Sequence, residues 1–230
     1  MTFLEHYHQK RREAHDTIRE IHDADLVIVP SGVGEPPSIL TALSEQRRDL
    51  RGVRVAQILP TRKYAYFDSE TTEHVRHLAL FFGIASRPGG QHGWIDFVPA
   101  SFSELPALID RGLFPADVVV SMASPMDAHG NFSLSLAPDY TMAAIRKARS
   151  LILEVNPNVP FAGGNCHVHI SQVSALVESE ASSGGGSACH RTCTGGHRKV
   201  RCRPCSRRSH PADRLRRNSR CGGHATQPQT

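Results

Sequence analysis

The sequence predicts an α/β fold, a three-layer arrangement in which a mostly parallel sheet lies between helices. The first observation is a set of continuous apolar runs, such as residues 24–30 and 117–122, which are typical of strands buried on both faces. The second is that segments with helical spacing separate these runs. The third is that the loops between them are short and rich in Gly, Pro and Ser, which favours strand–helix–strand units.

The apolar runs place the strands. Residues 24–30 end in Pro30, and residues 53–59 follow Gly52, which ends the preceding helix. Strands are further predicted at 94–98, 117–122, 150–155 and 167–170, followed by a short apolar segment at 173–178. Because ligands of parallel sheets bind at the carboxyl ends of the strands, the loops at 31–37, 123–136 and 156–165 are the candidate site loops.

Helices are predicted between these strands. Residues 5–21 are polar with apolar side chains at helical spacing, and Pro36 or Pro37 opens a helix that runs through Leu50. The other predicted helices span 72–82, 102–113 and 139–149, and Ser101 or Ser103 is positioned to cap the second of them.

The composition changes sharply near residue 181. Residues 181–230 carry 11 Lys and Arg against one acid, Asp213, whereas residues 1–180 carry 16 basic and 21 acidic residues. The same fifty residues hold five of the six cysteines, no aromatic residue, and only Val200 and Leu215 as large aliphatic side chains. Such a segment buries too little apolar surface to offset its chain entropy, so we expect a domain at 1–180 and a disordered basic tail at 181–230.

Several classes of protein are excluded. No apolar run approaches the roughly eighteen residues of a membrane span, and residues 1–23 are charged and lack the apolar core of a secretory signal. The body holds one cysteine, Cys166, so it is not a disulfide scaffold, and we expect a cytoplasmic protein without a membrane partner.

A glycine turn follows the first predicted strand. Gly32, Gly34 and Pro36 lie between that strand and a helix, where backbone amides can bind a phosphate or a carboxylate. The turn lacks the third glycine of a dinucleotide fingerprint and the Lys-Ser/Thr pair of a P-loop. The alternative is a tight strand-to-helix turn without a ligand.

The loop after residues 117–122 is dense in polar groups. Asp127 and His129 could orient a substrate or each other, and Gly130 follows them. The alternative is a capped loop in which Asp127 closes a turn and Gly130 supplies a positive φ.

Two metal hypotheses arise from histidine and cysteine. His167 and His169 share a strand face and could chelate, but no carboxylate or cysteine completes a set there, which favours ordinary histidines and no metal. In the tail, a four-thiolate zinc pattern is formed by Cys189, Cys193, Cys202 and Cys205. With the basic residues it would suggest a zinc-stapled nucleic-acid-binding protein, but the lack of aromatic residues and of an apolar core in this segment argues against that interpretation.

Four stretches of the body carry a resemblance to a known family. They are residues 29–36 (VPSGVGEP), 124–134 (SPMDAHGNFSL), 153–160 (LEVNPNVP) and 169–179 (HISQVSALVES). Residues 24–180 thereby resemble the first domain of the acetyl-CoA hydrolase/4-hydroxybutyrate CoA-transferase family, class I CoA-transferases with two similar α/β domains.

The resemblance implies a thioester exchange with coenzyme A as substrate and no other cofactor. A glutamate of the second domain attacks the acyl-CoA carbonyl, and the resulting acyl-glutamyl anhydride is converted by CoA thiolate into a glutamyl-CoA thioester. An acceptor carboxylate, from a small carboxylic acid, then takes the CoA, which completes the transfer. Water as the acceptor gives hydrolysis instead. No residue of this chain matches that nucleophile, so we expect no catalytic residue in it, and Gly32, Gly34, Pro36, Asp127, His129 and Gly130 are the candidates for lining the cleft.

The tail is also predicted to be frameshifted. Codons that encode residues 210–222, read with a one-base shift, permit Thr-Leu-Gln-Ile-Gly-Phe-Gly-Gly-Ile-Pro-Asp-Ala. That string resembles the glycine-rich loop that opens the family's second domain. The predicted function is therefore that of a CoA-transferase or acetyl-CoA hydrolase in acetate or 4-hydroxybutyrate metabolism. The 230-residue chain alone is expected to be inactive, and formation of a homo-oligomer is left open. The alternatives are the zinc-stapled nucleic-acid-binding protein and a non-catalytic CoA-binding module.

Overall fold

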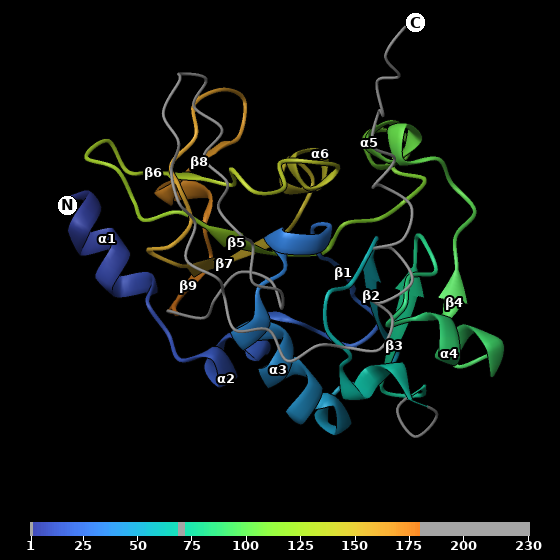
Figure 1. Cartoon of the computed structure of the whole chain (residues 1–230). Coiled ribbons are helices and arrows are strands. Elements are labelled where there is room, and N and C mark those ends of the chain that lie inside the picture. The colour runs from blue at the N-terminus through green and yellow to red at the C-terminus, as the bar shows by residue number, and fades with distance from the viewer. Residues whose placement is uncertain (1, 69–71, 180–230) are drawn as a thin grey trace, which may run out of the picture. The chain divides into compact units, whose positions relative to one another are not determined.

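The structure, a computed structural model, describes residues 2–68 and 72–179. The predictions for 181–230, namely the disordered tail, the frameshift and the zinc pattern, lie outside these residues. The described chain forms one seven-stranded sheet and one two-stranded sheet, with short helices between the strands (Figure 1).

The main sheet is parallel throughout, in the order β4-β3-β2-β1-β5-β7-β9. Its strands are β1 (Leu26–Ile28), β2 (Val53–Gln57), β3 (Val75–Ala79), β4 (Asp96–Phe97), β5 (Val118–Ala123), β7 (Ser150–Val155) and β9 (Ala175–Glu178). The second sheet pairs β6 (Asn131–Ser133) antiparallel with β8 (His167–His169). The helices are α1 (Phe3–Lys10), α2 (Ala14–Thr17), α3 (Pro37–Glu45), α4 (Arg87–Gln91), α5 (Leu105–Asp110) and α6 (Thr141–Ile145).

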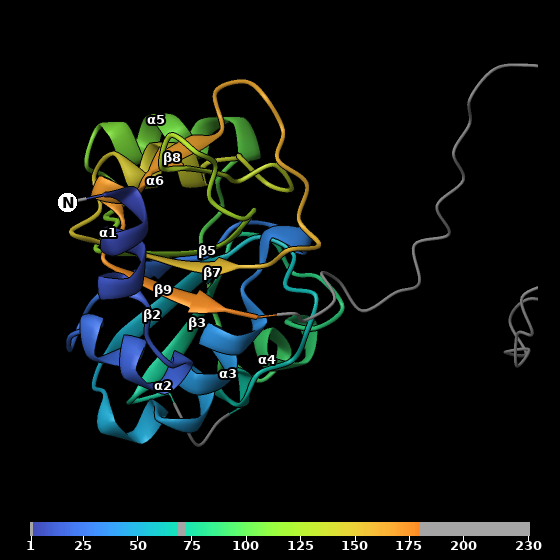
Figure 2. The same ribbon diagram turned by 90° about the vertical axis from the view of Figure 1, so that its left-hand side faces the viewer.

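Both faces of the main sheet are covered, which confirms the three-layer α/β prediction. Figure 2 shows α5, α6 and β8 on one side of the sheet and α2, α3 and α4 on the other. Consecutive side chains along β1 and the residue after it enter different cores: Leu26 and Ile28 pack on the α5–α6 side, and Val27 and Val29 pack on the α3 side. The period of two in a strand explains why a strand between two cores has a continuous apolar run.

One predicted helix is wrong. The segment 72–82 contains the strand β3 (Val75–Ala79), which pairs in parallel with β2 from Val53↔Val75 to Gln57↔Ala79. Four of its five residues are buried, including the polar His77. Because polar residues interrupt the apolar ones in this buried strand, the sequence pattern resembles that of a helix with one polar face. Tertiary burial decides the structure here against local pattern.

Other boundaries differ from the predictions. The segment 5–21 is broken because Arg11 forms a β-bridge with Leu176 and the Arg12 amide donates to the Leu176 carbonyl at 2.8 Å. The helix at 139–149 is reduced to α6, and that at 102–113 to a 3-10 turn followed by α5. Ser101 caps that turn through a capping box with Glu104, as predicted. Neither α4 nor β6 was predicted.

Among the described residues, none of the helices has the length and apolar character needed to cross a bilayer.

The buried His77 makes the fold sensitive to acid. Its ring is fully buried, with the Phe67 ring centroid 4.3 Å away, and this burial lowers the pKa of His77 from 6.5 to about 3. The unfolded chain therefore takes up a proton below pH 6.5 that the folded chain does not accept until about pH 3, so stability is lost as the pH falls through this window.

We predict that His77→Leu flattens the pH dependence of unfolding between pH 7 and pH 5, because the wild type loses about 2 kcal/mol at pH 5 through this residue. Urea unfolding at both pH values measures the difference. Substitution of the exposed His8 by Gln should leave the wild-type slope unchanged, and an equal slope in all three proteins would contradict the prediction.

Candidate functional site

The carboxyl ends of the parallel strands form one edge of the sheet, and the turns after β1, β2, β5 and β7 all lie there. The arrowheads of β7 and β9 point to the same side in Figure 2, and Figure 1 views the molecule from that side. Strand order reverses between β1 and β5, which are paired at Val27↔Val118 and Ile28↔Val119. A crevice beside such a reversal is the usual ligand site of an open parallel sheet.

The turn after β1 is closed by its own neighbours. The Ser31 amide donates to the Asp139 carboxylate at 3.0 Å, the Gly32 amide to the Leu59 carbonyl at 3.2 Å, and the Gly34 amide to the Ser31 carbonyl at 3.1 Å. Gly32 has a φ of +50°, as a tight turn requires. These contacts support the tight-turn interpretation over an amide nest that waits for an anion.

A buried carboxylate of β7 occupies the start of α3. Pro36 at the N-cap supplies no side-chain acceptor. Glu154, with no exposed surface, accepts from the Ser38 amide at 2.8 Å, the Ile39 amide at 3.2 Å and the Ser38 hydroxyl at 3.0 Å. Ser179, just after β9, donates its hydroxyl to the same carboxylate. Glu154 thus satisfies amides that a helix end leaves open, and it joins β7, α3 and the end of β9.

A second buried carboxylate supports the neighbouring turn. Glu35, 3 % exposed, accepts from Gln57 Nε2 at 2.8 Å, the Thr61 amide at 2.9 Å and the Tyr64 hydroxyl at 2.6 Å. The Tyr64 hydroxyl titrates far above its usual range, because burial and the adjacent Glu35 both raise its pKa. Glu35 therefore ties the turn after β1 to the turn after β2.

The polar loop after β5 is a capped turn. Asp127 accepts from the backbone amide of Asn131 at 2.7 Å and from that of His129 at 2.9 Å. The hydrogen bond from the Asn131 amide is the main cause that holds the pKa of Asp127 below its usual value. Gly130 has a φ of +81°, and a Cβ there would lie 3.0 Å from Phe3 and from His169. These contacts match the capped-loop alternative; the His129 side chain is exposed, and Asp127 holds its backbone.

The two histidines of β8 each contact a neighbour of their own. His167 Nε2 lies 2.8 Å from the Ala162 carbonyl, and His169 Nδ1 lies 2.8 Å from the Ser171 hydroxyl. Within residues 2–68 and 72–179, no three His, Cys, Asp or Glu side chains gather in a way that could hold a metal ion.

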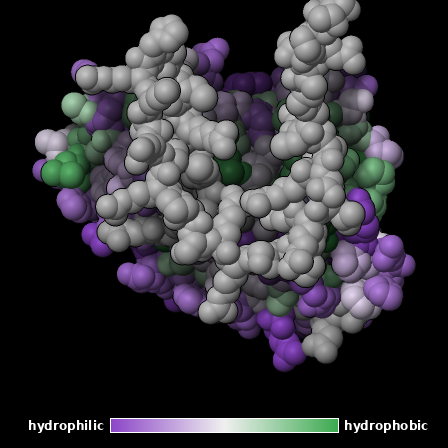
Figure 3. Space-filling view, in the orientation of Figure 1, coloured by the Kyte–Doolittle hydropathy of each residue, from purple (hydrophilic) through white to green (hydrophobic). Residues whose placement is uncertain are grey.

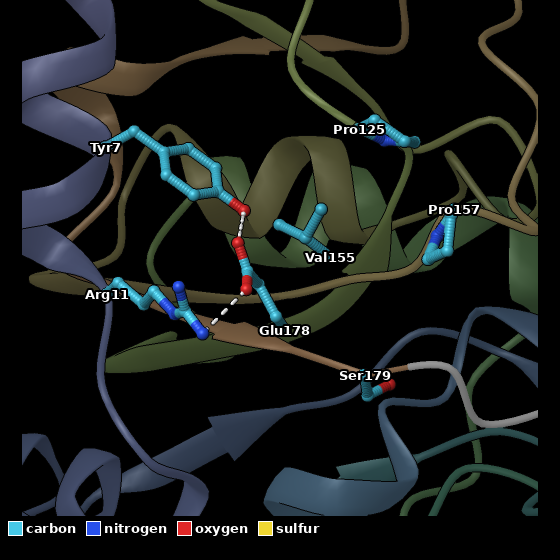
Figure 4. A pocket seen from close by; sticks show the side chains of 7 residues that line it. All are labelled: Tyr7, Arg11, Pro125, Val155, Pro157, Glu178 and Ser179. Atoms are coloured by element: carbon cyan, nitrogen blue, oxygen red, sulfur yellow. Dashed lines mark hydrogen bonds and ion pairs between the residues drawn. The ribbon is translucent and has the colours of Figure 1, made fainter.

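A hollow of about 450 Å³ lies at the carboxyl ends of β7 and β9 (Figure 4). Pro125, Val155 and Pro157 line it beside a polar group in which Glu178 accepts from the Tyr7 hydroxyl at 2.8 Å and pairs with Arg11 at 3.0 Å. Burial and the contact with Glu178 raise the pKa of Tyr7 above its usual range. This hollow combines an apolar floor with a hydrogen-bonded ion pair.

A second hollow lies at the other half of the edge. It holds about 570 Å³, and Gly32 lines it together with Leu59, Phe81 and Arg87. Of the six predicted cleft residues, the structure places Gly32 in this hollow; Gly34, Pro36, Asp127, His129 and Gly130 line neither of the two.

Sequence reasoning missed the two buried glutamates and the polar group on the first hollow. Glu35 and Glu154 lie inside stretches 29–36 and 153–160, which carry the family resemblance, and a carboxylate within an otherwise apolar strand was the available signal for Glu154. Tyr7, Arg11 and Glu178 meet across 171 residues of sequence, so no local pattern indicates them.

Comparison with known proteins identifies the family. A family model described as the acetyl-CoA hydrolase/transferase N-terminal domain matches residues 1–182. The chain belongs to this family.

Two relatives of this acetyl-CoA hydrolase/transferase domain are named CoA transferases. The chain is 38% identical over 180 residues to the succinyl-CoA:cyclohexane-1-carboxylate CoA transferase of Geobacter metallireducens, covering 77% of this chain and 40% of that protein. It is 30% identical over 178 residues to the 4-hydroxybutyrate coenzyme A transferase of Clostridium kluyveri, covering 77% and 42%. The chain thus spans about two fifths of these relatives' length.

Solved structures agree with the acetyl-CoA hydrolase/transferase fold. The crystal structure of RipA from Yersinia pestis superposes with a TM-score of 0.73 at 27% identity, over 79% of this chain and 44% of that one. A 4-hydroxybutyrate CoA-transferase from Porphyromonas gingivalis superposes at 0.59 over 77% and 41% at 24% identity, which supports the fold.

The glycines of the turn predict two different substitution effects. A Cβ on Gly34 would lie 2.6 Å from the Ala137 Cβ and 3.1 Å from the Pro30 Cβ, whereas a Cβ on Gly32 meets nothing within 4 Å but has a φ of +50°. Gly34→Ala should therefore destabilise the domain by about 1–3 kcal/mol through overpacking, and Gly32→Ala by about 1 kcal/mol through backbone strain.

Urea unfolding of both variants measures these effects. Gly93→Ala is the matched control, because Gly93 has a φ of +73° and open surroundings, so its substitution shows the cost of backbone strain away from the candidate site. A Gly34→Ala protein as stable as the wild type would show that Ala137 is free to move away from the turn.

Proposed function

We propose that the described domain is one half of a two-domain enzyme that transfers CoA between carboxylic acids, and that its carboxyl edge lines the cleft for acyl-CoA. The observation that carries the proposal is the match of residues 1–182 to the N-terminal domain of the acetyl-CoA hydrolase/transferase family. The geometry of the carboxyl edge also supports the proposal. The buried side chains of Glu154 and Glu35 hold its turns by hydrogen bonds, and two hollows at the edge are open to a ligand.

The proposed chemistry is covalent catalysis by a carboxylate. A glutamate of the second domain attacks the thioester carbonyl, the C–S bond breaks, and CoA leaves as a thiolate. The thiolate returns to the acyl-glutamyl anhydride, releases the carboxylic acid and leaves a glutamyl-CoA thioester, from which an acceptor carboxylate takes the CoA. In this scheme the described domain binds and orients substrate and contributes no nucleophile.

Transfer is proposed ahead of hydrolysis. The relatives are named for transfers involving cyclohexane-1-carboxylate, 4-hydroxybutyrate and butyrate, so family membership leaves the acyl group open. CoA is proposed as a substrate rather than a bound cofactor, with small carboxylic acids as the other partners. We also propose a cytoplasmic location, based on the single cysteine among residues 1–180.

We predict that the purified 230-residue chain binds CoA but does not transfer it. Calorimetry with CoA should show binding, and an assay with acetyl-CoA and butyrate should stay at the blank rate, because the nucleophile belongs to the other domain. Exchange well above the blank would overturn the division of labour. Absence of CoA binding would contradict the placement of the cleft on this edge. CoA binding by this chain without turnover, even after a second domain of the family is added, would favour a non-catalytic CoA-binding module.

We further predict that this chain self-associates. Leu59 and Phe81 are 48 % and 51 % exposed at the edge, and exposed apolar side chains of this size favour association. Sedimentation velocity should show species larger than a monomer that increase with concentration. A monodisperse monomer at high concentration would contradict this.

A further inference from the structure

The first helix borders a gap at the carboxyl ends of β7 and β9. No residue of α1 is buried, and two hollows lie along this helix, of about 450 and 240 Å³. Both hollows are lined by Tyr7 of α1 and by Pro125 and Val155 at the strand ends. The smaller hollow adds Leu4 and Met126. Because the two hollows share three lining side chains, we call them together the α1 gap.

A few contacts hold α1 in place beside this gap. The Lys10 ammonium donates to the carbonyls of Ile170 and Val173 at 2.8 and 2.6 Å. The Phe3 ring meets the His169 ring edge-on, with 5.4 Å between their centroids. Figure 3, in the orientation of Figure 1, shows apolar surface where α1 lies, and Phe3 is 42 % exposed. Because a helix held by so few contacts opens more readily than the sheet, a ligand that fills the gap stabilises its position.

Arg11 offers hydrogen-bond donors at the rim of the α1 gap. The Glu178 carboxylate accepts from the Tyr7 hydroxyl with one oxygen and pairs with Arg11 Nη2 through the other. Among the described residues, this pair is the one contact of the Arg11 guanidinium, whose side chain is 53 % exposed. Its Nη1 and Nε groups are therefore left to a ligand, and a planar guanidinium fits a carboxylate particularly well.

The rest of the α1 gap is largely apolar. Most of its other lining side chains carry no hydrogen-bonding group beyond a thioether: Leu4, Pro125, Met126, Val155 and Pro157. The exception is Ser179, whose hydroxyl donates to Glu154. In Figure 4 the two prolines and Val155 lie on the far side of Glu178 from Arg11. A hydrocarbon chain therefore fits the gap, whereas a second charged group would lose hydration there or approach the carboxylate of Glu178.

We propose that the α1 gap is a second, non-catalytic binding site, which takes a free monocarboxylic acid with an apolar chain. The carboxylate of the acid binds Arg11, the chain lies across Val155 toward Met126, and the bound acid stabilises α1 in its place. The gap shares no lining residue with the hollow at Leu59 and Phe81, so the site does not depend on CoA. One consequence rests on the proposed function: because a free acid is both acceptor and product of CoA transfer, this site would respond to the acid concentration.

The first test is calorimetric titration of the 230-residue chain with acetate, butyrate, hexanoate and succinate, in the absence of CoA. A fully buried methylene strengthens binding about fourfold, so a chain covered on one side should make hexanoate bind about tenfold more tightly than acetate. Succinate should bind about fivefold more weakly than butyrate, which has the same number of carbons, because its second carboxylate loses hydration.

Hydrogen exchange measures whether the acid stabilises α1. At a hexanoate concentration about ten times the dissociation constant, the amides of α1 that exchange by local opening should slow about tenfold. The amides of α4, which opens without disturbing the gap, should keep their rates.

Arg11→Gln tests the contact with the carboxylate. It removes the cation and keeps a polar side chain, so the affinity for hexanoate should fall about fivefold or more. Arg12→Gln is the matched control, because Arg12 donates to the Gln9 and Arg11 carbonyls and lines neither hollow. Leu4→Ser tests the apolar part without touching the ion pair: Leu4 is 59 % exposed, and its loss should reduce the preference for hexanoate over acetate about twofold.

Equal affinities of the wild type and Arg11→Gln for hexanoate, or succinate binding as tightly as butyrate, would overturn the inference. Exchange of α1 that hexanoate leaves unchanged would also overturn it. Hexanoate binding that is lost in Leu59→Asn and kept in Arg11→Gln would place the acid in the other hollow and overturn it as well. CoA binding is measured separately: if the chain binds hexanoate as expected but not CoA, the proposed function fails and this site stands.

Discussion

The carboxyl edge of this domain depends on the buried carboxylate of Glu154. It replaces the missing cap of α3, accepts two backbone amides and two hydroxyls, and thereby connects β7, α3 and the residue that follows β9. Burial of this side chain is tolerated because four hydrogen-bond donors reach its carboxyl oxygens. Glu35 repeats the arrangement between the turns after β1 and β2, so two internal carboxylates fix the backbone of the edge.

This internal support separates structure from binding along the edge. The turn residues Gly34 and Pro36 serve packing and the start of α3, and Asp127 with Gly130 closes the turn before β6. Among the described residues, open surface remains at the hollow beside Tyr7, Arg11 and Glu178 and at the hollow lined by Leu59 and Phe81. The proposed role, in which this domain orients a substrate for a nucleophile on another domain, requires rigid surfaces of this kind rather than reactive side chains.

The doubly covered strands were predictable because both of their faces are apolar, as β1, β5 and β7 illustrate. β3 could not be predicted, because Arg76 and His77 interrupt its apolar pattern. Its burial depends on pairing with β2 and on the aromatic residues of 64–67, which lie elsewhere in the sequence. The site divides in the same way. Gly32 could be placed from its position after a strand, whereas the contact of Tyr7 with Glu178 and the exposure of Leu59 depend on how distant segments meet.

Hydrogen exchange of the Glu154→Gln chain tests the central claim most directly. A glutamine offers one acceptor oxygen where the carboxylate offers two, and a lost buried partner costs about 1–3 kcal/mol. The account predicts that the Ser38 and Ile39 amides and the amides at the end of β9 exchange roughly tenfold or more faster, while those of β2 and β3 keep their protection. Unchanged protection at Ser38 and Ile39, or a uniform loss across all strands, would contradict the account.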